Sequence, residues 1–246
     1  MKIAVINFSG NVGKTTVARH LLLPRVEGAE LINVESLNAD EGHGQALRGR
    51  QFGQLQEYLQ SIENVVVDIG ASNVEDLLGL MRRYRGSHED FDCFVVPTVH
   101  ALKQQQDTIA TLVELARLGV PESRLKLVFN MVEDGVGVAH AFDTVLAFIA
   151  EKPIAQANMN CWLGTNEIYE RVKGTDADLA ALARDDTNYK ALIIKAKASA
   201  DKLALAQKLA TRRLASGVVP ELDACFQALG LVGGIERPEP ASRQAA

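Results

Sequence analysis

The chain has 246 residues, of which 47% are hydrophobic and 23% are charged, and its net charge is −5. This size and composition are ordinary for a globular protein with one large core, and no apolar run approaches the ~20 residues that span a bilayer. We expect no signal peptide, and Cys93, Cys161 and Cys225 form no CxxC pair, which argues against a disulfide framework or a zinc site and favours a cytoplasmic protein.

Short apolar runs alternate with segments of helical spacing over the first 150 residues. The runs have the length and β-branched character of strands that are buried on both faces of a sheet. We expect strands at Lys2–Phe8, Leu31–Val34, Val65–Ile69, Cys93–Val99 and Leu125–Val132. We expect helices at Lys14–Leu23, Gln45–Ile62, Val74–Tyr84, Lys103–Leu118 and Val138–Ala150. The alternation predicts an α/β fold, a mostly parallel twisted sheet with helices on both faces, of the P-loop NTPase type.

The alternation weakens after the fifth helix. Pro153–Asn158 is expected to add one more strand. Asp186–Leu214 is rich in Ala, Lys and Leu and lacks Pro and Gly, which predicts one helix that Gly217 and Pro220 end, before a short final helix at Glu221–Leu229. We therefore expect an α/β domain at 1–185, a C-terminal helical extension at 186–235 and a disordered tail at 236–246.

The segment Phe8–Thr16 (FSGNVGKTT) follows the first strand and opens the first helix. In that context its backbone N–H groups and the helix N-terminus are suited to bind phosphate. The candidate nucleotide-binding residues are Gly10, Asn11, Val12, Gly13, Lys14, Thr15 and Thr16. Lys14 would reach the β- and γ-phosphates as a catalytic residue, and Thr15 would ligate Mg²⁺. The segment predicts a site for a nucleoside triphosphate, ATP with magnesium; the alternative is a tight turn without a ligand.

This loop resembles the phosphate loop of the ParA/MinD family of ATPases, which reads roughly K-G-G-x-G-K-T-[ST]. The matching residues are Gly10, Gly13, Lys14, Thr15 and Thr16. Asn11 replaces a glycine, and Ser9 stands where the family has its signature lysine. That lysine reaches the partner's nucleotide across an ATP-sandwiched dimer, so the resemblance implies an ATP-dependent homodimer, whereas Ser9 leaves dimer-coupled hydrolysis without its usual residue.

Polar residues follow three other strands, where ligands bind in parallel sheets. Asp68 ends a strand and is expected to hold Mg²⁺, the alternative being a helix N-cap or a solvated turn. In the loop after Asn33, the resemblance implies a water-orienting acid; Glu35 and Asp40 are the acids there, and Asp40 is either catalytic or only a loop charge. The resemblance also implies that Asn130 bonds the adenine edge; its alternative is a turn-forming Asn.

The C-terminal segment is cationic. From Asn188 onward there are nine Lys/Arg and five Asp/Glu, a balance of +4, whereas the remainder carries −9. The expected helix holds Lys190, Lys195, Lys197, Lys202, Lys208, Arg212 and Arg213. Such a helix could bind DNA phosphates non-specifically, as basic late helices do in relatives that move plasmids. The alternatives are a solvated helix whose leucines pack inward and a helix lying on an anionic membrane.

The resemblance covers roughly residues 1–160. In the departures of its loops and in its Ala/Lys helix, the sequence resembles StbB-type plasmid stability proteins. This resemblance implies an ATP-binding and ATP-hydrolysing switch that acts with a partner protein in plasmid or DNA segregation. Two alternatives stay open: a nucleotide-binding platform with little hydrolysis, and an ATP-dependent ligase or synthetase on the same fold, for which we find no second substrate motif.

Overall fold

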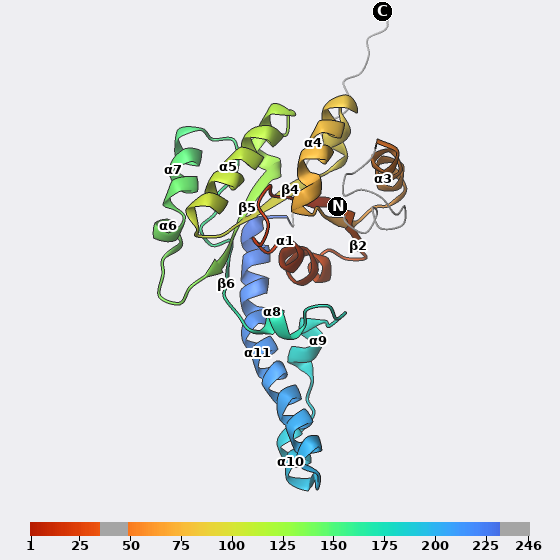
Figure 1. Cartoon of the computed structure of the whole chain (residues 1–246), viewed down its shortest axis with the longest axis vertical. Coiled ribbons are helices and arrows are strands. Elements are labelled where there is room, and N and C mark those ends of the chain that lie inside the picture. The colour runs from red at the N-terminus through yellow and green to blue at the C-terminus, as the bar shows by residue number, and fades with distance from the viewer. Residues whose placement is uncertain (35–48, 232–246) are drawn as a thin grey trace, which may run out of the picture.

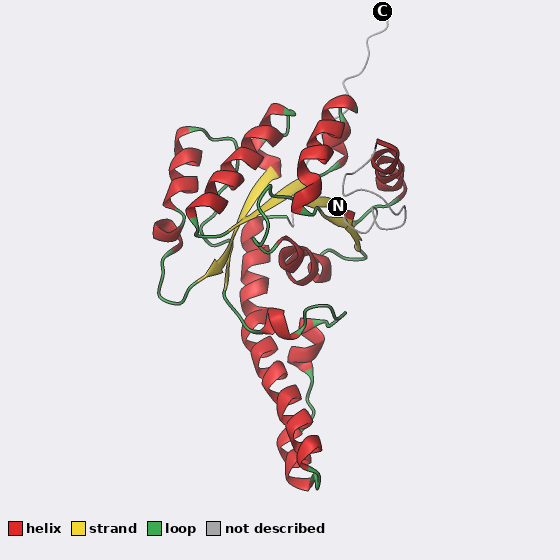
Figure 2. Cartoon of the chain, in the orientation of Figure 1, coloured by secondary structure: helices red, strands yellow, loops and turns green. Residues whose placement is uncertain are grey.

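A parallel sheet forms the centre of the fold in the computed structural model, which describes residues 1–34 and 49–231 (Figures 1 and 2). Within these residues the sheet has six strands in the order β2-β3-β1-β4-β5-β6, and every neighbouring pair is parallel. The strands are β1 (Lys2–Val5), β2 (Glu30–Asn33), β3 (Val65–Asp68), β4 (Cys93–Thr98), β5 (Leu125–Val132) and β6 (Trp162–Gly164). The predicted α/β fold is confirmed.

Helices cover both faces of the sheet, because alternate strand side chains point to opposite faces. Ala4 and Ile6 pack into one layer, and Ile3 and Val5 into the other. The first layer is covered by α3 (Gly49–Ser61), α4 (Val74–Arg83), α5 (Leu102–Arg117) and α7 (Asp143–Glu151), with α6 (Val138–Ala141) before the last. The second is covered by α1 (Lys14–Thr16), its continuation in η1 (Val17–Leu22) and η2 (Leu23–Arg25), α8 (Ile168–Arg171), α9 (Leu179–Arg184) and α11 (Ser199–Leu229). Each fully buried large apolar side chain contributes roughly 1.5–3 kcal/mol.

Short 3-10 helices also join these elements, namely η4 (Ala71–Asn73), η5 (Ser87–Asp90) and η6 (Glu122–Arg124). The three cysteines are buried and free, as expected, and burial raises the pKa of Cys93 to about 12. Their thiols are therefore protonated at neutral pH and belong to the packing rather than to the chemistry of a site.

The strand expected at Pro153–Asn158 is wrong. This segment makes only one isolated bridge, between Gln156 and Lys126, and the strand beside β5 is Trp162–Gly164 instead. Pro153 has no N–H to donate to a ladder. Asn158 forms a turn, with its carbonyl accepting from the N–H of Cys161 at 2.8 Å, and the chain joins the sheet only after it. The helices α8 and α9 that come next were not anticipated by the sequence pattern.

The single helix expected at Asp186–Leu214 is also wrong. The chain forms α10 (Tyr189–Lys195), breaks at residues 196–198, and continues as α11. α11 runs on through Gly217 and Pro220, which were expected to end it. A proline inside a helix costs about 3 kcal/mol, but Pro220 is exposed, and its neighbours pack against the body. The buried residues on either side are Ala215, Val218, Leu222 and Cys225.

The far end of α11 and the antiparallel α10 project from the body as a helical arm, which we define as residues 188–213 (Figure 1). Arg212 fastens its base: the guanidinium donates to the carbonyls of Asp185 and Thr187 at 3.0 and 2.7 Å and lies over the Tyr189 ring. Most large aliphatic side chains of the arm do not pack inward. Ile194 is 81% exposed and Leu203 62%, whereas only Leu209 is buried.

Two expectations concern residues outside the described ranges, namely the tail at 236–246 and the loop that carries Glu35 and Asp40. Within the described residues, no helix combines the length and the apolar character that crossing a bilayer requires.

Candidate functional site

The phosphate loop lies between β1 and α1, at the carboxyl edge of the sheet. Asn11 and Gly13 have φ angles of 56° and 82°, in the left-handed region that glycine adopts most easily. Lys14 is buried, and its ammonium folds back over the loop, where Nζ donates to the carbonyl of Ser9 at 2.7 Å and to that of Asn7 at 3.2 Å. The lysine is thus held beside the space that the loop encloses.

A buried amide, that of Asn7, fixes the loop from below. Its Nδ2 donates to the carbonyl of Pro97 and to Thr108 Oγ1, both at 2.8 Å, and its Oδ1 accepts from the N–H of Ser9 at 2.8 Å. Thr111 Oγ1 accepts from the N–H of Phe8 at 3.1 Å. These bonds tie the loop to β4 and α5. They were missed from the sequence, where Asn7 lies inside an apolar run and gives no signal of its own.

Asn130, near the end of β5, holds the other side of the loop. Its Nδ2 donates to the carbonyl of Val12 at 2.9 Å, and the side chain is buried. A Cβ placed on Gly13 would come within 2.0 Å of that Nδ2, so the left-handed glycine is also required by this close approach. The structure therefore places Asn130 against the loop; its contact with adenine stays a prediction.

Thr15 and Asp68 meet beside the loop. Thr15 Oγ1 donates to Asp68 Oδ2 at 2.6 Å, and Asp68 is buried at the end of β3. Asn33, which ends β2, is the register partner of Asp68. A hydroxyl and a carboxylate are hard oxygen donors of the kind that Mg²⁺ prefers. The expected alternative for Asp68, a solvated turn, does not fit this burial.

A single cavity of about 820 Å³ joins these groups. It is lined by the loop residues Gly10, Asn11, Gly13, Lys14, Thr15 and Thr16, together with Asp68 and Asn33. Residues that the sequence did not single out line it as well, including Arg19, His20, Met131 and Tyr169. Val12, by contrast, is buried. The cavity has room for a nucleotide.

No protein-family model and no curated protein matches the sequence. Among solved structures, the chain is similar to apo McdA of Cyanothece, with 14% identity and a TM-score of 0.46, over 75% of this chain and 94% of that one. It is similar to an ATP complex of Cyanothece McdA, with 14% identity and a TM-score of 0.47, over 96% and 99%. It is also similar to ParA of pNOB8 bound to nonspecific DNA, with 12% identity and a TM-score of 0.36, over 90% and 98%. The likeness concerns the fold alone.

Two aromatic side chains also line the cavity. His20 lies on η1, which continues the helix after the loop, and Tyr169 lies on α8. Their ring centroids are 5.8 Å apart. Burial lowers the pKa of His20, and the neighbouring charge of Arg19 lowers it further, so the imidazole is neutral at pH 7. The position of His20, six residues after Lys14 on the same helical segment, is the only sequence signal that could have found it.

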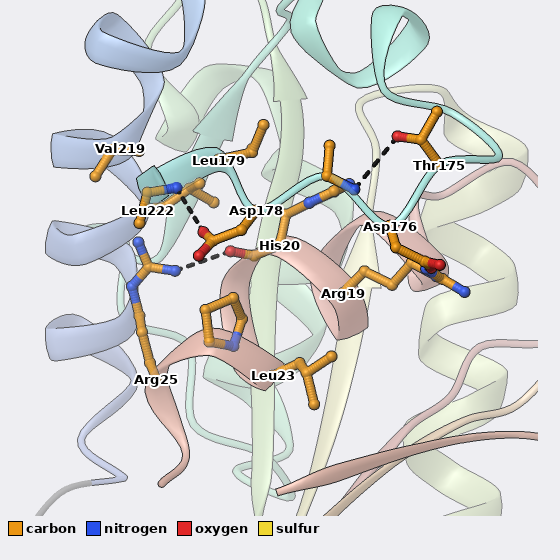
Figure 3. A pocket seen from close by; sticks show the side chains of 13 residues that line it. Arg19, His20, Leu23, Arg25, Thr175, Asp176, Asp178, Leu179, Val219 and Leu222 are labelled. Atoms are coloured by element: carbon orange, nitrogen blue, oxygen red, sulfur yellow. Dashed lines mark hydrogen bonds and ion pairs between the residues drawn. The ribbon is translucent and has the colours of Figure 1, made fainter. Parts of the chain in front are cut away.

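A second cavity, of about 280 Å³, shares Arg19 and His20 with the first and is lined by η1, η2, α9 and α11 (Figure 3). Its charged groups already have partners. Arg19 pairs with Asp176 at 3.4 Å, Arg25 donates to the carbonyl of His20 at 2.8 Å, and Asp178 caps α9 by accepting from backbone N–H groups (Figure 3). This cavity is lined by neither the phosphate loop nor the Thr15–Asp68 pair, so the first cavity is the stronger candidate site.

Proposed function

We propose that this chain is an ATP-binding and ATP-hydrolysing switch of the ParA/MinD type, close to the StbB kind, that acts in plasmid or DNA segregation. One observation carries the proposal. The ammonium of Lys14 and the Thr15–Asp68 pair face one cavity at the carboxyl edge of a parallel sheet, next to a loop with left-handed residues at Asn11 and Gly13. This arrangement matches the needs of a triphosphate and its metal ion.

Each group has a role in this proposal. The loop N–H groups and Lys14 bind the β- and γ-phosphates, whose negative charge the lysine offsets. Thr15 and Asp68 hold Mg²⁺, which would supply further charge neutralisation at the phosphates. Asp40 orients the attacking water, and Asn130 secures the loop through Val12 or bonds the base.

The first test is a titration of the wild-type chain with ATP, by calorimetry, in magnesium and in EDTA. We expect binding in magnesium and weaker binding in EDTA, because the metal offsets charge at the phosphates. Turnover is then measured with and without duplex DNA, and stimulation by DNA is expected for a switch that serves segregation. A chain that binds no nucleotide at millimolar magnesium would refute the proposal.

A nucleotide-binding platform with little hydrolysis is the second candidate, and Ser9 favours it. Ser9 stands where relatives have a lysine, its side chain is buried, and its carbonyl is occupied by Lys14. It therefore offers no cation to the nucleotide of a second copy. Tight ATP binding with negligible turnover, with and without DNA, would favour this candidate over the switch.

The proposed partners are a second copy of the chain, formed in an ATP-dependent way, a partner protein of the segregation system, and DNA bound through the arm. The arm exposes Lys197, Lys202 and Lys208, whereas Arg212 is used to fasten its base. Exposed lysines that neutralise phosphates release counterions, and this makes the affinity depend on salt.

Replacing Lys197, Lys202 and Lys208 together by glutamine should weaken binding to duplex DNA. Loss of up to three phosphate contacts makes the negative slope of log K against log salt shallower by about 2–3. Fluorescence anisotropy with a labelled duplex at several salt concentrations measures both effects.

A charge-matched control removes three exposed cations of the body, namely Arg85, Lys103 and Lys152. This control should bind DNA as the wild type does. Equal losses in the two triple variants would mean that net charge, rather than the arm, determines DNA affinity.

A further inference from the structure

The cavity of the phosphate loop is also lined by aromatic rings, and a role for these rings in binding a base rests on the proposed nucleotide function. Tyr169 and His20 both line it, from α8 and from η1 respectively. Their rings are neighbours, with centroids 5.8 Å apart and planes inclined by 37°. A nucleotide whose phosphates lie in the loop would place its base elsewhere in the same cavity, and these two rings are part of the lining outside the loop.

The hydroxyl of Tyr169 does not face the cavity. Its oxygen is buried and has no hydrogen-bond partner among residues 1–34 and 49–231. Burial raises the pKa of Tyr169, and Glu221 and Cys225 on α11 raise it further, so the hydroxyl lies toward that helix. The part of Tyr169 that borders the cavity is consequently its ring, which offers a π surface rather than a hydrogen-bond donor.

Asn130, which the family resemblance implies for binding the adenine edge, makes a different contact in the structure. Asn130 donates its Nδ2 to the carbonyl of Val12, where it supports the phosphate loop. Because its pKa is lowered, His20 is neutral at pH 7, and its imidazole ring lies next to the phenol ring of Tyr169, so both can offer a ring face to a base.

We propose that Tyr169 and His20 form a stacking platform for the nucleobase, so that the chain selects its nucleotide by the face of a purine rather than by its edge. Stacking tolerates different bases because every base has a π face. The larger ring system of a purine gains more from stacking than a pyrimidine does. ATP and GTP should accordingly bind with similar affinity, and CTP and UTP more weakly.

The test compares Tyr169→Ala with Tyr169→Phe, using calorimetry with magnesium ATP and with magnesium tripolyphosphate, which has no base. Loss of the ring should weaken ATP binding about 30-fold, the middle of the range for one stacked base. Tripolyphosphate should bind both variants as it binds the wild type. Tyr169→Phe keeps the ring and loses only a hydroxyl without a partner, so it should bind ATP within about twofold of wild type.

Two further variants guard against a folding defect. Tyr169→Leu keeps apolar volume in place of the ring, and His20→Ala removes the second ring; both should weaken ATP but not tripolyphosphate. Melting temperatures identify any variant that fails to fold. The inference is overturned if Tyr169→Leu binds ATP like the wild type, if Tyr169→Phe is as weak as Tyr169→Ala, or if ATP and tripolyphosphate weaken together. A wild type that binds tripolyphosphate as tightly as ATP overturns the platform alone, whereas one that binds neither overturns the proposed function and the platform with it.

Discussion

Replacement of Lys14 by alanine is expected to lower the affinity for magnesium ATP by about 100-fold, which corresponds to about 3 kcal/mol. The substitution removes the ammonium that offsets phosphate charge. It also leaves the carbonyls of Ser9 and Asn7 without the donor that they have now. Both effects act at the phosphates, so binding of tripolyphosphate should fall by a similar factor. Calorimetric titration of the two ligands measures the loss.

Lys173 provides the matched control for Lys14. It is an exposed lysine that lines the same cavity but is not part of the phosphate loop, and it pairs with Glu170 on α8 at 3.5 Å. Lys173→Ala removes the same charge from the cavity. Charge interactions of an exposed side chain are worth only roughly 0–1 kcal/mol in free energy, so this variant should change ATP affinity by only a few-fold. If the two variants lose the same affinity, the position of Lys14 in the loop has no special importance.

Replacement of Gly13 by alanine is expected to destabilise the fold by about 3 kcal/mol and to abolish tight ATP binding. A left-handed φ costs a residue with a Cβ about 1–2 kcal/mol, and overpacking costs a further ~1–3 kcal/mol. The new methyl group would lie 2.0 Å from Asn130 Nδ2, so the amide that holds Val12 has to move. For a chain of this size the expected drop in Tm is roughly 6–12 °C. Thermal melting followed by circular dichroism measures it.

The control for Gly13 is Gly10, in the same loop. A Cβ at Gly10 would meet no atom within 4 Å, and its φ is not left-handed. Gly10→Ala should therefore leave Tm within about 2 °C of wild type, the effect of a surface change of at most ~0.5 kcal/mol. Adding Asn130→Ala to Gly13→Ala removes the clash but not the strain, so the double variant should be less destabilised than the sum of the single ones. Additive effects would contradict the close approach of Gly13 to Asn130.

The sequence predicted those features that depend on local pattern. Five strands and the helices between them follow from apolar runs and helical spacing, and the phosphate loop follows from GKTT after a buried strand. The proximity of Thr15 and Asp68 could also be predicted from the sequence, because the carboxyl ends of parallel strands lie at one edge of the sheet.

Features that depend on tertiary contacts could not be predicted from the local sequence pattern. Pro220 lies inside a helix because the neighbouring turns bury Val218 and Leu222 against η1, and no local rule contains that packing. The polar side chain of Asn7 has a role only because β4 and α5 bring acceptors to it. The family resemblance implies that Asn130 bonds the adenine edge, whereas the partner of its amide in the structure is the backbone of the loop.

The length of α11 has a mechanical consequence. Its buried half is fastened to two other elements: Asp223 pairs with Arg25 of η2 at 2.7 Å, and Glu221 accepts from the N–H of Gly164, at the end of β6, at 2.9 Å. The helix continues from Glu221 back to Ser199, a distance of roughly 33 Å at 1.5 Å per residue. A rotation of about 5° at the fastened end therefore displaces the tip by about 3 Å. A small rotation of the elements that hold α11 therefore becomes a larger displacement at the tip of the arm, comparable to the length of a hydrogen bond.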